Sequence, residues 1–191
     1  KDRNLQSQWF LLETIFEYSV NAVSFKFSPD IVYSLHFAAS TFLTHNPGRI
    51  REGHVHIHGS EHVPPDPHEV SKLVFDLCQY LNGRENPGAS PLHLCAYAMW
   101  KLTWIHPFNE CNGRTARALA YLVYCHEKQR WLKGKKTLHE AIRESDKGYY
   151  IGLRIADESF KTSGVADLSV LEDYLRRIFH LQFRSEFDGE K

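Results

Sequence analysis

The chain has 191 residues, of which 42% are hydrophobic, and its 23 Lys and Arg residues balance its 23 Asp and Glu residues. This length and apolar content are sufficient for one compact domain with a hydrophobic core. A formal net charge of zero argues against a broad basic surface for nucleic acid or anionic lipid, although it leaves room for a local phosphate site. We therefore expect a globular protein that binds neither nucleic acid nor a membrane.

The cysteine pattern and the N-terminal residues give expectations about the cellular compartment. The four cysteines contain no C-x-x-C pair, and three lie in segments predicted as helices, so we expect buried reduced thiols at Cys78, Cys95, Cys111 and Cys125. We identify no signal peptide and no apolar run of transmembrane length. These features predict a cytoplasmic protein. Because the chain starts at Lys1 without a methionine, a fragment of a longer protein, including a secreted effector, is an open alternative.

The first half of the chain is mostly of helical pattern. Apolar residues recur at helical spacing over residues 8–23, and Ser28-Pro29 predicts a second helix that Asn46-Pro47-Gly48 ends. Residues 66–69 form a capping box with proline at the first helical position, and an apolar stripe follows them to Leu81. These signals predict three helices before residue 82.

The second half is also helical. Ser90-Pro91 starts a segment that is apolar on nearly all sides up to Ile105, as expected of a helix in the centre of a domain. Further helices are predicted over residues 112–129, 137–143, 149–160 and 168–183. The pattern therefore predicts an all-α fold.

One stretch has a different period. Residues 54–58 alternate His and apolar residues between Gly53 and Gly59, which predicts a short strand or hairpin that Pro64-Pro65 ends. The alternation places His54, His56 and His58 on one face of a strand. With His62 nearby they could bind zinc or another transition metal, as in a metal-dependent hydrolase. No cysteine or paired carboxylate completes such a set locally, so we favour a surface segment that contacts a target or water.

The stretch from His106 to Arg117 combines the parts of a phosphoryl-transfer site. A helix ends at a histidine, which can act as a general base near neutral pH. Glu110 offers the oxygen ligands that Mg²⁺ prefers. Asn112-Gly113 then starts a helix whose first N–H groups suit a phosphate, and Arg114 adds a planar cationic fork. Each part alone is ordinary, but the whole set within twelve residues predicts a nucleotide site.

This stretch resembles the signature of the Fic (filamentation induced by cAMP) family, His-Pro-Phe-x-(Asp/Glu)-Gly-Asn-Gly-Arg-x-x-Arg. Every specified position matches except Cys111, which stands where glycine is usual. A side chain there could narrow the phosphate cradle or change which nucleotide fits. The resemblance extends over residues 25–160, and residues 47–65 are similar to the family's flap. It implies the all-α Fic-type helical core with a small β-hairpin flap, divided into an N-terminal helix (1–24) and the Fic domain (25–191).

The resemblance also implies an activity, protein adenylyltransfer with ATP as co-substrate and Mg²⁺ as cofactor. His106 would deprotonate a Tyr, Thr or Ser hydroxyl of a target protein, and Glu110 would hold Mg²⁺. The nucleotide phosphates would bind the helix start and the arginines, at Cys111, Asn112, Gly113, Arg114 and Arg117. The flap would hold the target by strand-like pairing at Val55, His56, Ile57 and His58.

Some members of the family carry an inhibitory helix with the pattern (Ser/Thr)-x-x-x-Glu-(Gly/Asn). No stretch here matches in full, and the nearest is the segment from Glu13 to Tyr18. Our hypothesis is that Glu17 pairs with Arg117 and restrains the enzyme. A solvent-exposed Glu17 without such a role is the competing interpretation.

Several alternatives stay open. The same fold could use another nucleotide donor or remove AMP from a target. The chain could also bind a nucleotide or phosphate without turnover, if Cys111 prevents transfer. The target protein and the oligomeric state are open as well, and a homo-oligomer is one of the alternatives.

Overall fold

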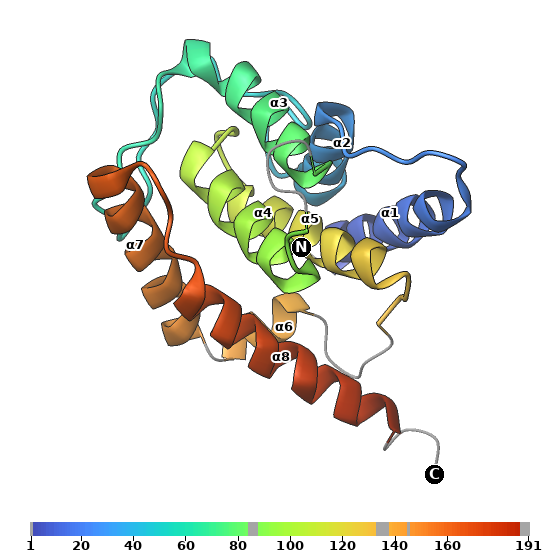
Figure 1. Ribbon diagram of the computed structural model, residues 1–191. Coiled ribbons are helices and arrows are strands. Elements are labelled where there is room, and N and C mark those ends of the chain that lie inside the picture. Colours follow the sequence, from blue (N-terminus) through green and yellow to red (C-terminus); the bar gives the residue numbers. More distant parts are fainter. Residues whose placement is uncertain (1, 84–87, 133–137, 145, 188–191) are drawn as a thin grey trace.

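The structure, a computed structural model, describes residues 2–83, 88–132, 138–144 and 146–187 (Figure 1). In chain order the elements are α1 (Asp2–Asn21), α2 (Pro29–Ser40), the short 3-10 helix η1 (Pro67–Glu69), α3 (Val70–Leu81), α4 (Pro91–Ile105), α5 (Asn112–Lys128), α6 (Leu138–Glu144), α7 (Asp146–Ser163) and α8 (Ser169–Phe187). The predicted all-α class is confirmed. Across these described ranges no helix is both long and apolar enough to cross a membrane.

Helices α4 and α5 form the centre of the molecule, and the other helices surround them (Figure 1). Small side chains are fully buried on both helices, at Ala96 and Ala98 of α4 and at Ala116 and Ala120 of α5. Small residues at a helix contact allow the two axes to approach closely. The central position predicted for α4 is confirmed. The loop that joins these two helices, residues 106–111, carries His106, Glu110 and Cys111, and the predicted phosphate-binding residues from Asn112 to Arg117 follow it on α5.

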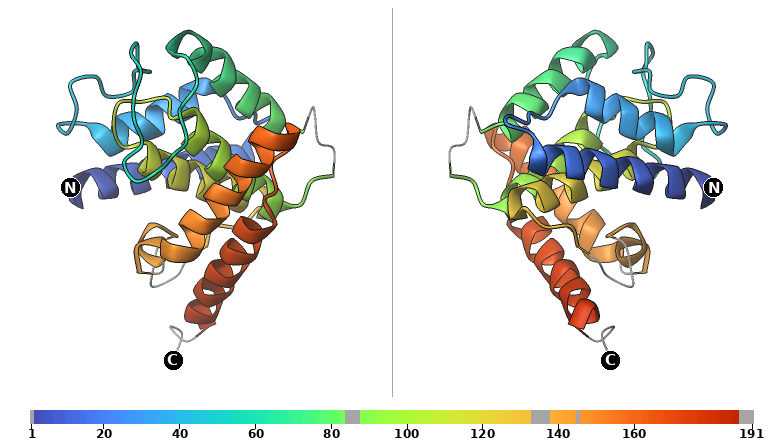
Figure 2. Two further views of the ribbon diagram at one scale, coloured as in Figure 1. Left: turned by 90° about the vertical axis from the view of Figure 1, so that its left-hand side faces the viewer. Right: turned by 90° about the vertical axis from the view of Figure 1, so that its right-hand side faces the viewer.

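The predicted β-hairpin flap is not present. Among the described residues there is no strand, and residues 49–66 form an irregular loop between α2 and η1 (Figures 1 and 2). The alternation of residues 54–58 does appear in burial, since Val55 and Ile57 are half-buried and His56 is exposed. A hairpin needs a second run that supplies N–H donors, and Pro64-Pro65 has no N–H to donate. The period therefore set which side chains are half-buried, but residues 54–58 have no partner strand within the described ranges.

The helix starts with capping signals lie where the sequence predicts them, whereas α1 starts at Asp2 and α7 at Asp146, earlier than the predicted residues 8 and 149. The Ser90 hydroxyl accepts a hydrogen bond from the His93 N–H (3.1 Å), and the Asp66 carboxylate accepts one from the His68 N–H (2.9 Å). In contrast, α2 ends at Ser40, several residues before the predicted stop at Asn46-Pro47-Gly48. The start of a helix depends on local capping, whereas its end depends also on what the rest of the fold packs there.

Helix α1 packs on α2 and α5 rather than standing apart. Leu12 and Phe16 of α1 belong to the same buried core as α5, and Trp9 packs edge-on against Trp131. The Gln8 amide donates to the Leu35 carbonyl of α2 (3.0 Å). Helix α1 thus shares its hydrophobic core with the rest of the chain. The division into residues 1–24 and 25–191 stays a prediction.

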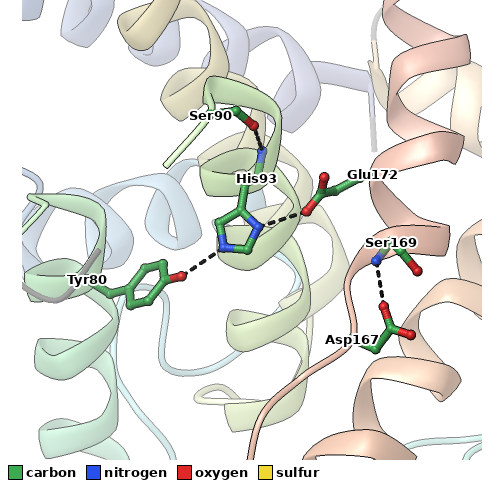
Figure 3. Close-up of polar contacts among 6 residues, drawn as sticks. All are labelled: Tyr80, Ser90, His93, Asp167, Ser169 and Glu172. Carbon is green, nitrogen blue, oxygen red and sulfur yellow. Dashed lines mark hydrogen bonds and ion pairs between the residues drawn. The ribbon is translucent and has the colours of Figure 1, made fainter. Parts of the chain in front are cut away.

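The last two helices are attached to α4 by polar contacts. Figure 3 shows His93 of α4 between the Glu172 carboxylate of α8 (2.8 Å) and the Tyr80 hydroxyl of α3 (2.8 Å). The Trp100 indole N–H of α4 donates to the Asp157 carboxylate of α7 (2.8 Å). These contacts join α7 and α8 to α4, the helix that ends at His106.

Candidate active site

The loop between α4 and α5 turns sharply at both of its ends. His106 ends α4 with φ 49°, and Cys111 precedes α5 with φ 59°. Both are non-glycine residues in the left-handed region, which costs about 1–2 kcal/mol for a residue with a Cβ. Such strain persists only where the surrounding contacts fix the backbone, and it is frequent at functional sites.

Asn112 supplies the main contact that closes the loop. Its side chain accepts a hydrogen bond from the Phe108 N–H (2.9 Å) and donates one to the Phe108 carbonyl (2.7 Å). Both residues are almost fully buried. We predicted a phosphate-binding role for Asn112, and the structure assigns its side chain to the loop. Its backbone N–H lies in the first turn of α5, where N–H groups have no partner within the helix and suit an anion.

His36 of α2 braces the same loop and was missed in the sequence. Its Nδ1 accepts the Gly48 N–H (2.9 Å), its Nε2 donates to the Glu110 carbonyl (3.2 Å), and its ring stacks on Phe108 at 3.7 Å. Burial lowers the pKa of His36 from 6.5 to about 4, so the ring is neutral at pH 7. The available signal was a histidine within the inward-facing stripe of α2, beside Val32 and Leu35.

His106 is held with one ring nitrogen available for chemistry. Its Nδ1 lies 3.2 Å from the Thr103 carbonyl oxygen. A carbonyl only accepts, so Nδ1 carries the proton and Nε2 keeps its lone pair. Burial lowers the pKa of His106, and the charges of Arg51 and His62 lower it further. A neutral imidazole with a free Nε2 can accept a proton at pH 7.

Glu110 has the exposure that a metal ligand at a nucleotide site requires. Its backbone carbonyl is held by His36, whereas its carboxylate is exposed and makes no hydrogen bond or ion pair within the part of the chain that the structure describes. The donor set is a hard carboxylate in front of an anion-binding helix start, which fits Mg²⁺ shared with phosphate oxygens.

The two arginines lie on the first two turns of α5. Arg114 Nη1 is 3.4 Å from the Ala39 carbonyl oxygen and 3.8 Å from Cys111 Sγ. The guanidinium of Arg117 lies over Gly113, where an added Cβ would stand 3.2 Å from its Nη1. Gly113 therefore leaves room for that guanidinium. Burial raises the pKa of the Cys111 thiol and outweighs the opposing charge of Arg114, so Cys111 is a thiol rather than a thiolate.

Both arginines border a cavity between α1, α5 and α6. Its volume is about 380 Å³, and it is lined mainly by apolar side chains together with two carboxylates, Glu13 of α1 and Glu140 of α6. Glu17 is exposed and is not among the lining residues. The structure therefore brings Glu13, one turn earlier in α1, to the cavity of Arg114 and Arg117. The inhibitory role of Glu17 stays a prediction, and Glu17 does not line the cavity that the two arginines border.

The histidine-rich segment does not form a metal site in the described part of the chain. His54, His56 and His58 are exposed, and no group of three potential metal-binding His, Cys, Asp or Glu residues is found there. His62 Nε2 instead hydrogen-bonds the Trp104 carbonyl at the end of α4 (2.8 Å). The hydrolase alternative therefore has no geometric basis among these residues.

These features define a class of protein. The family model of the Fic/DOC family matches residues 26–124, which is more than half of the chain, and the chain belongs to this family. A protein adenylyltransferase Fic from Drosophila persimilis is 39% identical over 72 residues, which are 38% of this chain and 14% of that protein. The chain thus matches only a small part of the length of such curated relatives.

Solved structures show the same fold. Fic-1 (residues 134–508) from C. elegans has a TM-score of 0.73 at 21% identity, over 96% of this chain and 48% of that one. A Fic family protein from Desulfovibrio desulfuricans has a TM-score of 0.66 at 24% identity, over 93% of this chain and 53% of that one. At these identities the likeness establishes the fold.

Proposed function

We propose that this chain is a nucleotidyltransferase of the protein adenylyltransferase type, which transfers AMP from ATP to a Tyr, Thr or Ser hydroxyl of another protein. The observation that carries the proposal is the pairing of a neutral His106 with the anion-binding start of α5 across one short loop. The relatives named protein adenylyltransferase support the type of reaction. Their match covers a small share of their length, so the donor and the target belong to the proposal.

The start of α5 would bind the donor phosphates. The N–H groups of its first turn and the positive end of the helix dipole attract an anion. Arg114 and Arg117 add permanently charged forks, one on each of the first two turns. Cys111 supplies a neutral thiol at this position, so it adds no charge that would repel phosphate.

The transfer step follows from these positions. The target hydroxyl oxygen attacks the α-phosphorus of ATP, and its proton passes to His106 Nε2. A new oxygen–phosphorus bond forms while the bond between the α-phosphorus and the bridging oxygen breaks. Pyrophosphate leaves with that oxygen, and its charge is stabilised by the arginines and the helix start.

Glu110 would hold Mg²⁺ in this site. Its exposed carboxylate and its place before α5 fit that ion, and bound Mg²⁺ would neutralise charge on the phosphate oxygens. His36 holds the Glu110 backbone, so it would orient this ligand.

The target would lie against residues 54–58. Val55 and Ile57 are half-buried, and the histidines between them are exposed. The backbone of this segment has no partner strand among the described residues, so a target segment could pair with it as an added strand.

The test is an incubation of the chain with ATP, Mg²⁺ and a cell lysate, followed by mass spectrometry for AMP adducts. We expect adducts on proteins, and we expect His106→Ala to lower their rate by about 100-fold or more, as for loss of a general base. ATP binding should survive in that variant, because His106 lies outside the phosphate cradle. Saturable ATP binding without adducts would favour a binding module or another donor, and no nucleotide binding would refute the proposal.

A brake on this activity would act through α1. Glu13 borders the cavity of Arg114 and Arg117, so its carboxylate can compete with ATP phosphates for these arginines. We therefore expect Glu13→Gln to raise the rate of self-modification more than Glu17→Gln does. The two variants form a matched pair on one helix. Faster modification in Glu17→Gln alone would restore the hypothesis made from the sequence, and equal rates in both variants and the wild type would remove the brake.

A further inference from the structure

Arg51 is the most deeply buried cation near the site, and the proposed mechanism does not use it. Its exposed fraction is 2%, although it begins the surface segment that runs to η1. Its backbone N–H donates to the Pro107 carbonyl (2.8 Å). This bond already joins the segment to the 106–111 loop.

The guanidinium of Arg51 adds further hydrogen bonds between the surface segment and the end of α4. Toward the end of α4, its Nε donates to the His106 carbonyl (2.9 Å) and its Nη2 lies 3.4 Å from the Ile105 carbonyl oxygen. Toward the segment, its Nη1 donates to the Gly53 carbonyl (3.0 Å) and its Nη2 to the Pro65 carbonyl (2.6 Å). A planar fork thus fixes four carbonyls relative to one another.

These acceptors bracket the region that would hold a target under the proposed function. Gly53 and Pro65 lie at the two ends of the flap segment, which we define as residues 53–65. The flap segment is therefore closed at its base by one side chain, and that side chain also bonds the residue that bears the proposed base. His62 adds a second tie, to the Trp104 carbonyl.

The hydrogen-bond partners of the Arg51 guanidinium are backbone carbonyls. Arg51 makes no ion pair with a carboxylate among the described residues. Burial lowers its pKa, and only the charge of Asp66 opposes this. Burying a charge without an ionic partner is costly, and neutral side chains often fill such places at lower cost. A buried cation beside His106 suggests a role in the site itself.

We propose that Arg51 is a positioning residue for the transfer reaction, which holds the base of the flap segment, and with it the bound target hydroxyl, at a fixed place relative to the His106 imidazole. This inference rests on the proposed function. Because reacting groups must be held within fractions of an ångström, loosening this base would slow transfer more than it weakens nucleotide binding.

The experiment compares Arg51→Lys and Arg51→Met with Arg49→Lys and Arg49→Met. Arg49 is exposed and two residues away, so its variants are matched controls. Lysine keeps the charge but cannot span four carbonyls, and we expect about a 100-fold loss of kcat in Arg51→Lys with an unchanged affinity for ATP. The Arg49 variants should keep the wild-type rate.

A pH profile separates the effect of the Arg51 charge from the effect of its geometry. The positive charge of Arg51 lowers the pKa of His106. Arg51→Met should therefore raise that pKa and move the acid limb of kcat to higher pH, while Arg51→Lys should leave the limb in place. The other charged groups of the site are unchanged in these variants, namely His62 of the flap segment, Glu110 of the loop, and Arg114 and Arg117 of α5.

Two measurements do not depend on activity. NMR titration of His106 reports its pKa, and hydrogen exchange at the amide of residue 51 reports its bond to Pro107. We expect a raised His106 pKa in Arg51→Met and faster exchange in Arg51→Lys, even if the wild type transfers no AMP and the proposed function fails. An unchanged titration and unchanged exchange would overturn the proposal. A transfer rate that falls only in proportion to the folded fraction would also overturn it. Loss of folding in both Arg51 variants would do the same, because either result assigns Arg51 to the fold alone.

Discussion

The 106–111 loop and the flap segment lie next to each other and are held in opposite ways. The loop is fixed from inside by buried contacts, with Asn112 closing it and His36 stacked on Phe108. The flap segment is mostly exposed and is fixed mainly at its base, by Arg51. Under the proposed function, the reacting groups would sit on a loop fixed by buried contacts, and the surface for a target would sit on a segment that few internal contacts constrain.

The strongest test of this contrast removes the contact that closes the loop. Asn112→Ala leaves the buried N–H and carbonyl of Phe108 without partners, which costs about 1–3 kcal/mol for each such group. We expect the free energy of unfolding to fall by about 2–4 kcal/mol, measured by urea denaturation.

Asn109→Ala is the control, because Asn109 is an exposed residue of the same loop. Its effect should stay within about 0.5 kcal/mol. Equal effects of the two substitutions would show that the loop is not fixed by Asn112.

The second prediction concerns acid: protonation of His36 should lower the free energy of unfolding. Its pKa in the folded protein is about 4, below its ordinary value of 6.5, because burial disfavours the charged ring. The unfolded chain therefore binds this proton first as pH falls. The stability that His36 contributes is complete above pH 6.5 and is lost as pH falls through about 4. The loss amounts to about 3 kcal/mol.

Denaturation curves between pH 7 and pH 4 measure this loss. His36→Gln should be less stable at pH 7 and should show a flatter dependence on pH. A slope remains, since burial also lowers the pKa of His106 and of His126. His45→Gln changes an exposed histidine and should keep the wild-type slope. A wild-type slope in His36→Gln would contradict the proposed brace.

The flap segment should show the smallest effect on stability and a selective effect on targets. Ile57→Ala removes part of a half-buried side chain, and we expect the free energy of unfolding to change by about 0.5–1 kcal/mol. Because the segment would contact the target but not ATP, KM for the target should rise while KM for ATP stays the same. A rise in KM for ATP would place this segment at the nucleotide instead.

The sequence predicted the local features well. The twelve residues from His106 to Arg117 predicted a candidate site, and the structure places them on one loop and the helix that follows it. Ser90 and Asp66 marked helix starts through side-chain caps that involve only neighbouring residues. Such signals survive in a single sequence because the interacting groups are a few residues apart.

The hairpin predicted from the alternating pattern was wrong. Residues 54–58 do alternate in burial, but a ladder needs a partner strand, and the period of one segment contains no information about its partner. The role of Glu17 stays a prediction, and a short pattern cannot say which turn of α1 borders the cavity of Arg114 and Arg117, where the structure places Glu13.

The sequence by itself determined the helical class, the helix starts that carry capping signals, and the order of the groups around His106. Only the tertiary structure decided that Asn112 closes the loop, that His36 is neutral against Phe108, and that Arg51 is buried between the flap segment and α4. Each of these depends on a partner brought close by folding. Their energies come from burial and from hydrogen bonds across the fold, which no local pattern encodes.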